Sequence, residues 1–401
     1  MKKITFAISL LFLFTAMAFS QTDSLEVKND SSYVFTDVVK IPTTTVKDQN
    51  RSGTCWAFAT TSFVETELLK KGKPTIDLSE MYSVRDTYLR KAENYVRLHG
   101  TANFSAGGQA HDVIKSIERT GFITEEAYAG LEYGHKGHNH SELDALLKAE
   151  VSVIAANKSR KINPSWLNVI EATLNEYLGK VPETFTFEGK EYTPKGFQKE
   201  MDFNTDDYVE ITSYSHHPYY SAFRLEIPDN WDYSDYYNVP LDEMMEIIDY
   251  AFDNGYSVCW DGDVSERGFS HNKGVAIVPE DDVKDMSGTE KDKWQTLTEK
   301  EKSKMMYSFD KPIQEKVITQ EIRQEEFNNH SATDDHLMHL TGVVTDQNGT
   351  RYYVTKNSWN SDSNDFGGYL NMSTSYIRMN TVAIMVNKKA IPKKIRKKLH
   401  L

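Results

Sequence analysis

Apolar residues recur at helical spacing through the first half of the chain. Between residues 55 and 71 they fall at Trp56, Ala59, Phe63 and Leu68, on one face of a helix. Similar patterns, several of them ending in Gly or Pro, predict further helices over about 80–98, 109–119, 142–157, 166–178 and 240–254. The segments "YTPKGFQKEM" and "SHHPYYSAF" lack this pattern, so we expect them to be irregular.

Short apolar and alternating runs predict strands in the last third of the chain. "HLMHLTGVVTD" and "TRYYVTKNSW" flank "QNG", which is typical of a hairpin, and "GGYLNMS" and "NTVAIMV" follow. "YSVCWDGDV" and "GVAIVP" predict two shorter strands earlier on. Helices first and strands last indicate an α+β fold. The region 141–320 changes in character, and we expect a large, mainly helical insertion packed on the body.

The first twenty residues are expected to be a signal peptide. Lys2 and Lys3 precede the apolar run "ITFAISLLFLFTAMAF", and Ala18 and Ser20 are small residues where a signal peptidase reads, which predicts cleavage before Gln21. An uncleaved anchor is the alternative. The pattern divides the chain into a signal peptide (1–20), an irregular N-terminal arm (21–45) and one folded domain (46–401), in a periplasmic or extracellular protein.

Charge and composition narrow the choice of partners. The formal net charge is −13, and it becomes −15 when Lys2 and Lys3 leave with the signal peptide. An acidic body argues against a nucleic-acid partner. No later apolar run is long enough to cross a bilayer, so integral membrane contact is not expected.

Cys55 is the strongest candidate for chemistry. The chain has only two cysteines, and this one stands in "DQNRSGTCWAFATTSF", at the start of the first predicted helix. A helix N-terminus and a nearby imidazolium bring a cysteine pKa from about 8.5 to roughly 3.5–7.5, and the thiolate is the nucleophile. Gln49 offers an amide donor that can hold an oxyanion with the Cys55 N–H. Cys259, beside Trp260 in a strand, is expected to be buried and inert.

A cysteine nucleophile needs a base and a group that orients the base. His336 opens the strand "HLMHLTGVV", and Asn357 lies in "KNSW" across the hairpin. A two-residue turn at "NG" would set the two about 13 Å apart along the strands. We therefore expect a wider loop over about 345–348, with Gly349 in a bulge conformation and His336 opposite Asn357.

These motifs resemble the papain-type cysteine peptidases. The similarity rests on Gln49 followed by "CWAFA", the "GG" at 107–108, "HLMHLTG" and "KNSW" in the family's order; the long insertion and "DVSERGF" resemble its bleomycin hydrolase and aminopeptidase C branch. The resemblance implies a helical half and a β-barrel-like half. It also implies Cys55 as nucleophile, His336 as base, Asn357 as orienting group and Gln49 in the oxyanion hole.

Further expectations come from the same resemblance. Gly107 and Gly108 match the backbone that aligns the substrate, with Trp56 and Trp359 beside them in the site, and Trp359 covers the His–Asn bond. The branch uses peptide substrates without a cofactor or metal, and it often forms homo-hexamers. Its members end in a tail that folds into the cleft, whereas this chain ends in "KKAIPKKIRKKLHL".

Other candidates have a simpler interpretation. His339 has the opposite strand parity to His336 and is expected to be structural. His135, His138 and His140 in "GHKGHNH" have imaginable zinc spacing, but a solvated loop is favoured. His216 and His217 are expected to be surface or packing residues, and Asp261 and Asp263 to end a strand rather than bind calcium. Ile391, Ile395 and Leu399 predict a short surface helix, which could instead touch an anionic envelope, an acidic neighbouring subunit or the cleft.

The sequence therefore predicts an exported cysteine aminopeptidase of the bleomycin hydrolase type. Two alternatives stay open: an endopeptidase with an open cleft, and a catalytically silent homologue that binds peptides. Side-chain specificity does not follow from the sequence.

Overall fold

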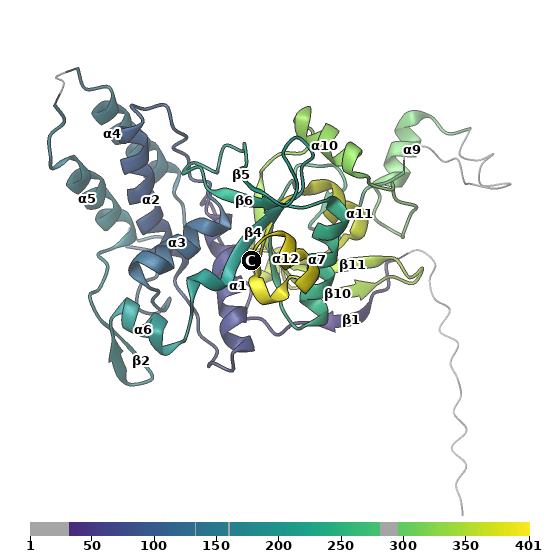
Figure 1. Ribbon diagram of the computed structural model, residues 1–401, viewed down its shortest axis with the longest axis horizontal. Coiled ribbons are helices and arrows are strands. Elements are labelled where there is room, and N and C mark those ends of the chain that lie inside the picture. The colour runs from purple at the N-terminus through teal and green to yellow at the C-terminus, as the bar shows by residue number, and fades with distance from the viewer. Residues whose placement is uncertain (1–31, 133, 159–160, 281–295) are drawn as a thin grey trace, which may run out of the picture.

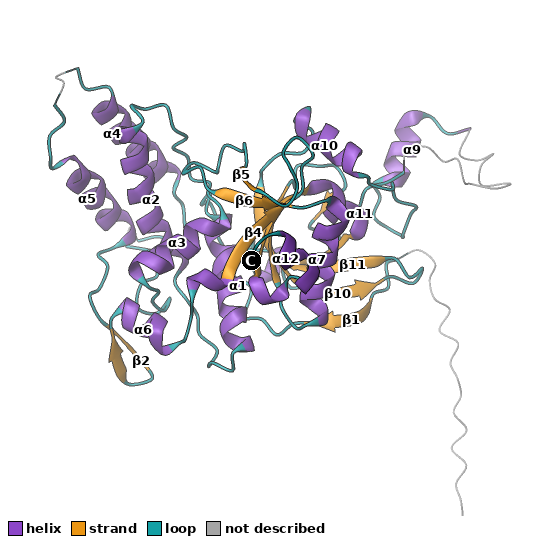
Figure 2. Cartoon of the chain, in the orientation of Figure 1, coloured by secondary structure: helices purple, strands orange, loops and turns teal. Residues whose placement is uncertain are grey.

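A helical half and a half built around a large sheet lie side by side in the computed structural model (Figure 1). The structure describes residues 32–132, 134–158, 161–280 and 296–401, so the predicted signal peptide lies outside the described residues. Helices dominate one side and strands the centre, which confirms the α+β class (Figure 2). Among the described residues, no helix combines the length and apolar character that a membrane span requires.

The helical half follows the predicted spacing closely. Ser79 caps the second helix by accepting a hydrogen bond from the Tyr82 N–H, and Gln109 caps the third in a capping box with Asp112. The helices of this half are α1 (Cys55–Lys70), α2 (Glu80–Arg97), α3 (Ala110–Thr120), α4 (Ser141–Ala155), α5 (Trp166–Leu178) and α6 (Pro194–Glu200), with the hairpin β2 (Phe185–Phe187) and β3 (Lys190–Tyr192) and the short η1 (Thr205–Asp207).

The other half holds an eleven-stranded mixed sheet within the described part of the chain. Its strands are β1 (Thr36–Lys40), β4 (Tyr208–Thr212), β5 (Ala222–Arg224), β6 (Asp235–Asn238), β7 (Val258–Gly262), β8 (Phe269–Ser270), β9 (Val275–Ala276), β10 (His336–Thr345), β11 (Arg351–Lys356), β12 (Tyr369–Ser373) and β13 (Thr381–Asn387). Their order is β5-β6-β4-β13-β7-β10-β11-β12-β9-β8, with β1 also paired to β10. The sheet stays open, so the half is not a closed barrel.

Two hydrophobic cores cover the two faces of this sheet. Along β7, Cys259 joins the core of the helical half, whereas Val258 and Trp260 join the core on the other face. Side chains alternate in the same way along β10. The second core is covered by α7 (Leu241–Asp253), α11 (Thr374–Asn380) and α12 (Lys393–Lys398); α9 (Glu299–Met306), α10 (Gln320–Asn328), η2 (Ser361–Ser363) and η3 (Lys388–Ala390) complete the fold.

Several boundary predictions are wrong. The N-terminal arm is not wholly irregular, because β1 pairs with β10. Residues 141–320 are not one insertion: β4 and β7 lie within the main sheet, and β7 pairs with both β10 and β13. "YTPKGFQKEM" contains the helix α6, which Thr193 caps by accepting from the Gly196 N–H. The basic tail does form a helix, but its apolar side is buried in the core.

Candidate active site

Cys55 lies at the start of α1, as predicted, and is half-buried. The residue before it, Thr54, occupies the N-cap position without a side-chain capping bond. The backbone of Leu337, the residue after His336 in β10, favours the thiolate form of Cys55 and lowers its pKa against the effect of burial. Packing of α1 on the sheet therefore brings the thiol to the strand that carries the candidate base.

His336 and Asn357 meet through their side chains. The Nε2 atom of His336 lies 2.8 Å from Oδ1 of Asn357, and both residues are buried. The Trp359 ring stacks on the imidazole, with centroids 5.0 Å apart and planes at 29°. Because the asparagine oxygen can only accept, Nε2 carries the proton and Nδ1 is left as the basic nitrogen.

The strand register that achieves this differs from our prediction. His339 pairs with Lys356, and the register shifts between Leu340 and Gly342. If the β10–β11 register continued by one more residue, Asn357 would lie opposite residue 338. The Asn357 side chain therefore reaches His336 diagonally, from beyond the end of β11. The loop runs over 346–350 instead of 345–348, although Gly349 does adopt a positive φ of 83°. An extra residue in β10 is a bulge that the sequence pattern did not reveal.

Gln49 is fixed between the segment that leads to Cys55 and the segment that carries Asn357. Its Oε1 accepts a hydrogen bond from Ser358 Oγ at 2.6 Å, and its Nε2 donates to the Ser52 carbonyl at 3.0 Å. Its backbone N–H also donates to the Ser358 carbonyl at 2.8 Å. These bonds tie the loop before Cys55 to the segment that carries Asn357, and they orient an amide that has a second N–H.

The glycine loop and Trp56 form one packed unit. Trp56 is fully buried and donates from Nε1 to the Ala106 carbonyl at 3.0 Å, so it supports the loop and has no surface to offer a substrate. A Cβ at Gly107 would stand 1.8 Å from Oδ2 of Asp229, and one at Gly108 would stand 2.9 Å from Oδ2 of Asp112. Both positions therefore require glycine for close approach rather than for unusual backbone angles.

The pKa values of the pair differ from the sequence expectation. Burial, together with the charges of Asp261, Asp334 and Asp229, raises the pKa of Cys55 to about 12. Burial also lowers the pKa of His336 to about 4, against the opposing effect of the Asn357 hydrogen bond. A helix dipole contributes only about 0.3–1 kcal/mol, which burial exceeds here. The substrate-free site thus favours a neutral thiol beside a neutral imidazole, and our expectation of a resting ion pair is wrong.

His271 supports Asn357 and was missed by sequence reasoning. Its Nδ1 lies 3.3 Å from Nδ2 of Asn357, and its Nε2 lies 2.7 Å from Oγ of Ser363. Its ring also packs edge-on against Trp359, with centroids 4.9 Å apart. The asparagine amide is therefore held on both sides, by one histidine that it orients and by another that orients it. His271 has no sequence signature, since only the fold brings it here.

Two aspartates raise the pKa of the Cys55 thiol: Asp334, which is half-buried and which sequence reasoning missed, and Asp261, which is buried and which we expected only to end a strand. Both oxygens of Asp334 accept from Nε2 of Gln109, at 3.0 and 3.1 Å. Asp261 lies opposite Leu337 in the sheet, and no cation pairs with Asp261 or Asp334 among the residues that the structure describes. Burial raises the pKa of both carboxyls, that of Asp334 to about 7, and the charge of Asp229 adds to the rise at Asp334. Asp334 stands two residues before His336, which is the one hint in the sequence.

The remaining histidine and cysteine predictions have mixed outcomes. His339 is structural, as predicted: it is fully buried on the opposite face and its Nδ1 lies 2.9 Å from Ser62 Oγ. Cys259 is a buried free thiol, also as predicted, and burial raises its pKa. The prediction of a solvated loop is wrong for His138 and His140, because both side chains are buried, with ring centroids 5.7 Å apart.

Comparison with known proteins points to one family. Residues 35–215 match the papain family cysteine proteases, and residues 292–400 match the peptidase C1-like family. Aminopeptidase G of Lactobacillus delbrueckii subsp. lactis is 22% identical over 395 residues, which cover 88% of this chain and 83% of that protein. Aminopeptidase W of the same organism is 23% identical over 399 residues, covering 89% and 84%.

A solved structure supports the same architecture. The crystal structure of PepW from Lactobacillus rhamnosis HN001 superposes with a TM-score of 0.70 at 18% identity, covering 91% of this chain and 84% of that one. At this identity the likeness establishes the fold.

Proposed function

We propose that this chain, which belongs to the papain-like cysteine peptidases, is an aminopeptidase that uses Cys55 as nucleophile, His336 as base and Asn357 as orienting residue. The observation that carries the proposal is the His336–Asn357 bond of 2.8 Å under the Trp359 ring. It leaves Nδ1 of His336 as the basic atom, and the backbone of the next residue, Leu337, lowers the pKa of Cys55.

The reaction is an acyl transfer through a thioester. His336 accepts the proton of the thiol as the sulfur attacks the peptide carbonyl, and the oxyanion forms near the Cys55 N–H and the Gln49 amide. The protonated imidazole then gives its proton to the leaving amine, and a water molecule, deprotonated by the same ring, releases the acyl group. Since the resting pair is neutral, the charges form only as the substrate reacts, and the Asn357 oxygen stabilises the imidazolium.

Three acidic side chains favour a substrate with a free amino terminus. Asp261, Asp334 and Asp229 all raise the pKa of Cys55, so a cation bound among them lowers that pKa. An α-ammonium group is such a cation, and in an aminopeptidase substrate it belongs to the same residue as the scissile carbonyl. The amino terminus therefore acts in two ways: it pairs with these carboxylates, and it makes the adjacent thiol easier to ionise.

The test uses two fluorogenic reporters, an aminoacyl amide with a free amino group and its N-acetylated twin. We expect the wild-type chain to cleave the free form with the higher kcat/KM. Asp334→Asn is expected to lower the ratio of kcat/KM for the free reporter to kcat/KM for the acetylated reporter at least tenfold. Asp253→Asn, at an exposed position near the end of α7, is the matched control and leaves the ratio unchanged. Equal cleavage of the two reporters would reject the aminopeptidase assignment.

A separate variant tests the chemistry. Cys55→Ala is expected to abolish turnover of both reporters while circular dichroism and the melting temperature stay close to those of the wild type. Hydrolysis retained by that variant would reject the nucleophile, whatever the reporter preference.

An endopeptidase is the second candidate, and one observation favours it. The basic segment after β13 packs away from Cys55: Ile395 and Leu399 are buried in the core on the α7 side of the sheet. A substrate-binding site that this segment leaves open would accept internal peptide bonds. Efficient cleavage of the acetylated reporter would support this function over the aminopeptidase, and a silent homologue would cleave neither.

Export and assembly complete the proposal. The N-terminal pattern supports export with cleavage before Gln21, and intact-mass analysis of the mature protein tests it. A homo-oligomer is proposed from the family resemblance, with light scattering of the purified protein as its test.

A further inference from the structure

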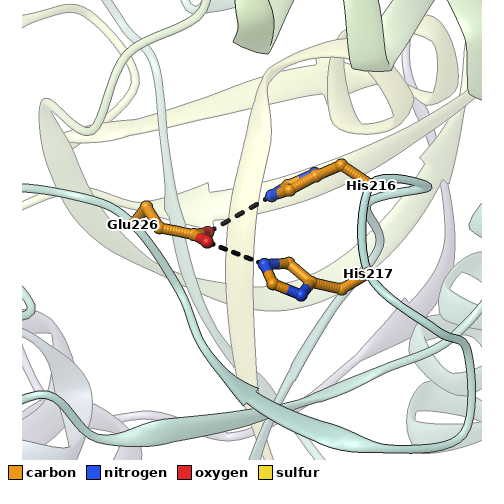
Figure 3. Close-up of side chains that lie close together, drawn as sticks. All are labelled: His216, His217 and Glu226. Carbon is orange, nitrogen blue, oxygen red and sulfur yellow. Dashed lines mark hydrogen bonds and ion pairs between the residues drawn. The ribbon is translucent and has the colours of Figure 1, made fainter.

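We propose that His216, His217 and Glu226 form a binding site for a zinc-like divalent cation on the sheet half of the molecule. The two histidines lie in the loop between β4 and β5, and the glutamate follows β5. Figure 3 shows all three side chains pointing toward one another. One ligand-type atom from each lies within 4.8 Å of the others.

The separations fit a shared ion. Nε2 of His216 lies 3.2 Å from Oε2 of Glu226, and Nε2 of His217 lies 2.7 Å from Oε1 (Figure 3). Ligands held about 2.0–2.1 Å from a tetrahedral zinc stand roughly 3.3 Å apart. A cation can therefore enter between the three groups after the carboxylate moves back by a few tenths of an ångström to about 1 Å, with no change in the backbone. Water would take the remaining position.

The two imidazole rings are held in place by neighbouring side chains. His217 stacks on Phe223, with centroids 4.0 Å apart and planes at 24°. His216 lies parallel to Phe327 at 5.7 Å. The amide of Gln324 reaches Nδ1 of His216, with Nε2 at 3.1 Å and Oε1 at 3.4 Å. Metal-binding histidines commonly have such a polar partner on the second nitrogen, which fixes the ring and its tautomer.

The donor set indicates the class of metal. Two imidazoles and one carboxylate suit zinc and similar transition metals, whereas calcium and magnesium prefer oxygen ligands. The side chains are 31%, 30% and 53% exposed, so an ion can enter from solvent.

Metal binding at this place would brace the segment that packs against the glycine loop. Glu226 is three residues before Asp229, whose carboxylate packs against Gly107 and accepts a hydrogen bond from Ser105 Oγ at 3.2 Å. An ion held by Glu226 and the two histidines ties this segment to the β4–β5 loop. Binding to the folded state alone also raises stability in proportion to the logarithm of the ion concentration above its Kd.

The test is zinc binding by the full chain carrying Cys55→Ala, which removes the reactive thiol as a competing ligand. Isothermal titration calorimetry at pH 7.5 is expected to give one equivalent of Zn²⁺, and X-ray absorption a first shell of nitrogen and oxygen near 2.0–2.1 Å without sulfur.

Variants decide whether these three residues hold the ion. In the same background, His216→Ala/His217→Ala and, separately, Glu226→Gln are expected to weaken binding at least tenfold, because each removes a direct ligand. His330→Asn removes an exposed imidazole outside the cluster, so binding should be unchanged. Asparagine suits this position because it tolerates the positive φ of 64°. No stoichiometric binding, or affinity unaffected by either ligand variant, would mean an adventitious ion only and would overturn the proposal. Glu226→Gln guards against misfolding, since it keeps the size of an exposed side chain.

Discussion

The bond between Asn357 and His336 gives the sharpest test of the catalytic assignment. Asn357→Ala removes an acceptor 2.8 Å from Nε2 of His336 and leaves a buried N–H without that partner. In the resting enzyme the ring is neutral, since burial lowers its pKa to about 4. It becomes a cation only when it takes the thiol proton, so the lost bond costs more in the transition state than in the ground state.

The expected size follows from that change of charge. A hydrogen bond to a charged group contributes about 1.5–3 kcal/mol, against about 0.5–1.5 kcal/mol for a neutral one. Because the resting enzyme loses the neutral bond as well, the difference of about 1–1.5 kcal/mol counts, and it corresponds to a roughly 5- to 13-fold fall in kcat/KM. His336→Ala removes the acid–base group itself, which is worth roughly 10²- to 10⁴-fold. We therefore expect both variants to be impaired, with the histidine variant the slower one.

The assay is steady-state kinetics with the free-amino reporter from pH 5 to 9. Trp359 still covers the ring in the asparagine variant, so its melting temperature should show that the fold is retained. Asn371→Ala, a half-buried asparagine on β12, is the matched control and should keep wild-type kcat/KM. If Asn357→Ala lost as much activity as His336→Ala at every pH, or none, the orienting role would be refuted.

Three further predictions concern the surroundings of the site. Gly262→Ala places a Cβ 2.2 Å from the Asn380 carbonyl oxygen, and should lower the free energy of unfolding by about 1–3 kcal/mol or more in chemical denaturation; an unchanged midpoint would contradict the close strand packing. Alkylation of Cys55 by iodoacetamide should accelerate with pH through the alkaline range, because the thiolate is the reacting form and the pKa of Cys55 is raised to about 12. An alkylation rate that reaches its plateau by pH 5 would show that a resting ion pair exists. Burial lowers the pKa of His138 to about 4 and that of His140 to about 3. As the pH drops, the unfolded chain therefore binds protons before the folded chain does, and stability should fall from about pH 6.5 to about pH 4. His140→Phe should flatten that pH dependence in thermal melts at stepped pH.

Local pattern was enough for the elements that carry the site, but not for their pairing. Helical spacing placed Cys55 at the start of α1, and strand parity separated His336 from His339. The bulge between Leu340 and Gly342 shifts the register by one residue, and nothing in a period-two pattern marks such an insertion.

Properties that depend on distant residues could not be read from the sequence. The pKa of Cys55 depends on burial and on aspartates from three different segments, so a rule about helix ends gave the wrong direction. His271 reaches Asn357 across 86 positions of sequence. The run "YSVCWDGDV" was recognised as a strand, but only its pairing with both β10 and β13 shows that it belongs inside the main sheet and not to an insertion.

The proposed nucleophile and the proposed base come from opposite sides of the junction between the two halves. Cys55 begins a helix of one half, and His336 begins a strand of the other, with Gln49 and Ser358 joined across the same seam. Turnover therefore depends on how the two halves pack against each other. A slight separation of the halves under mild heat or denaturant would abolish activity while the helices and the sheet remain folded. Conversely, a small molecule wedged into that seam would inhibit without ever occupying the peptide cleft.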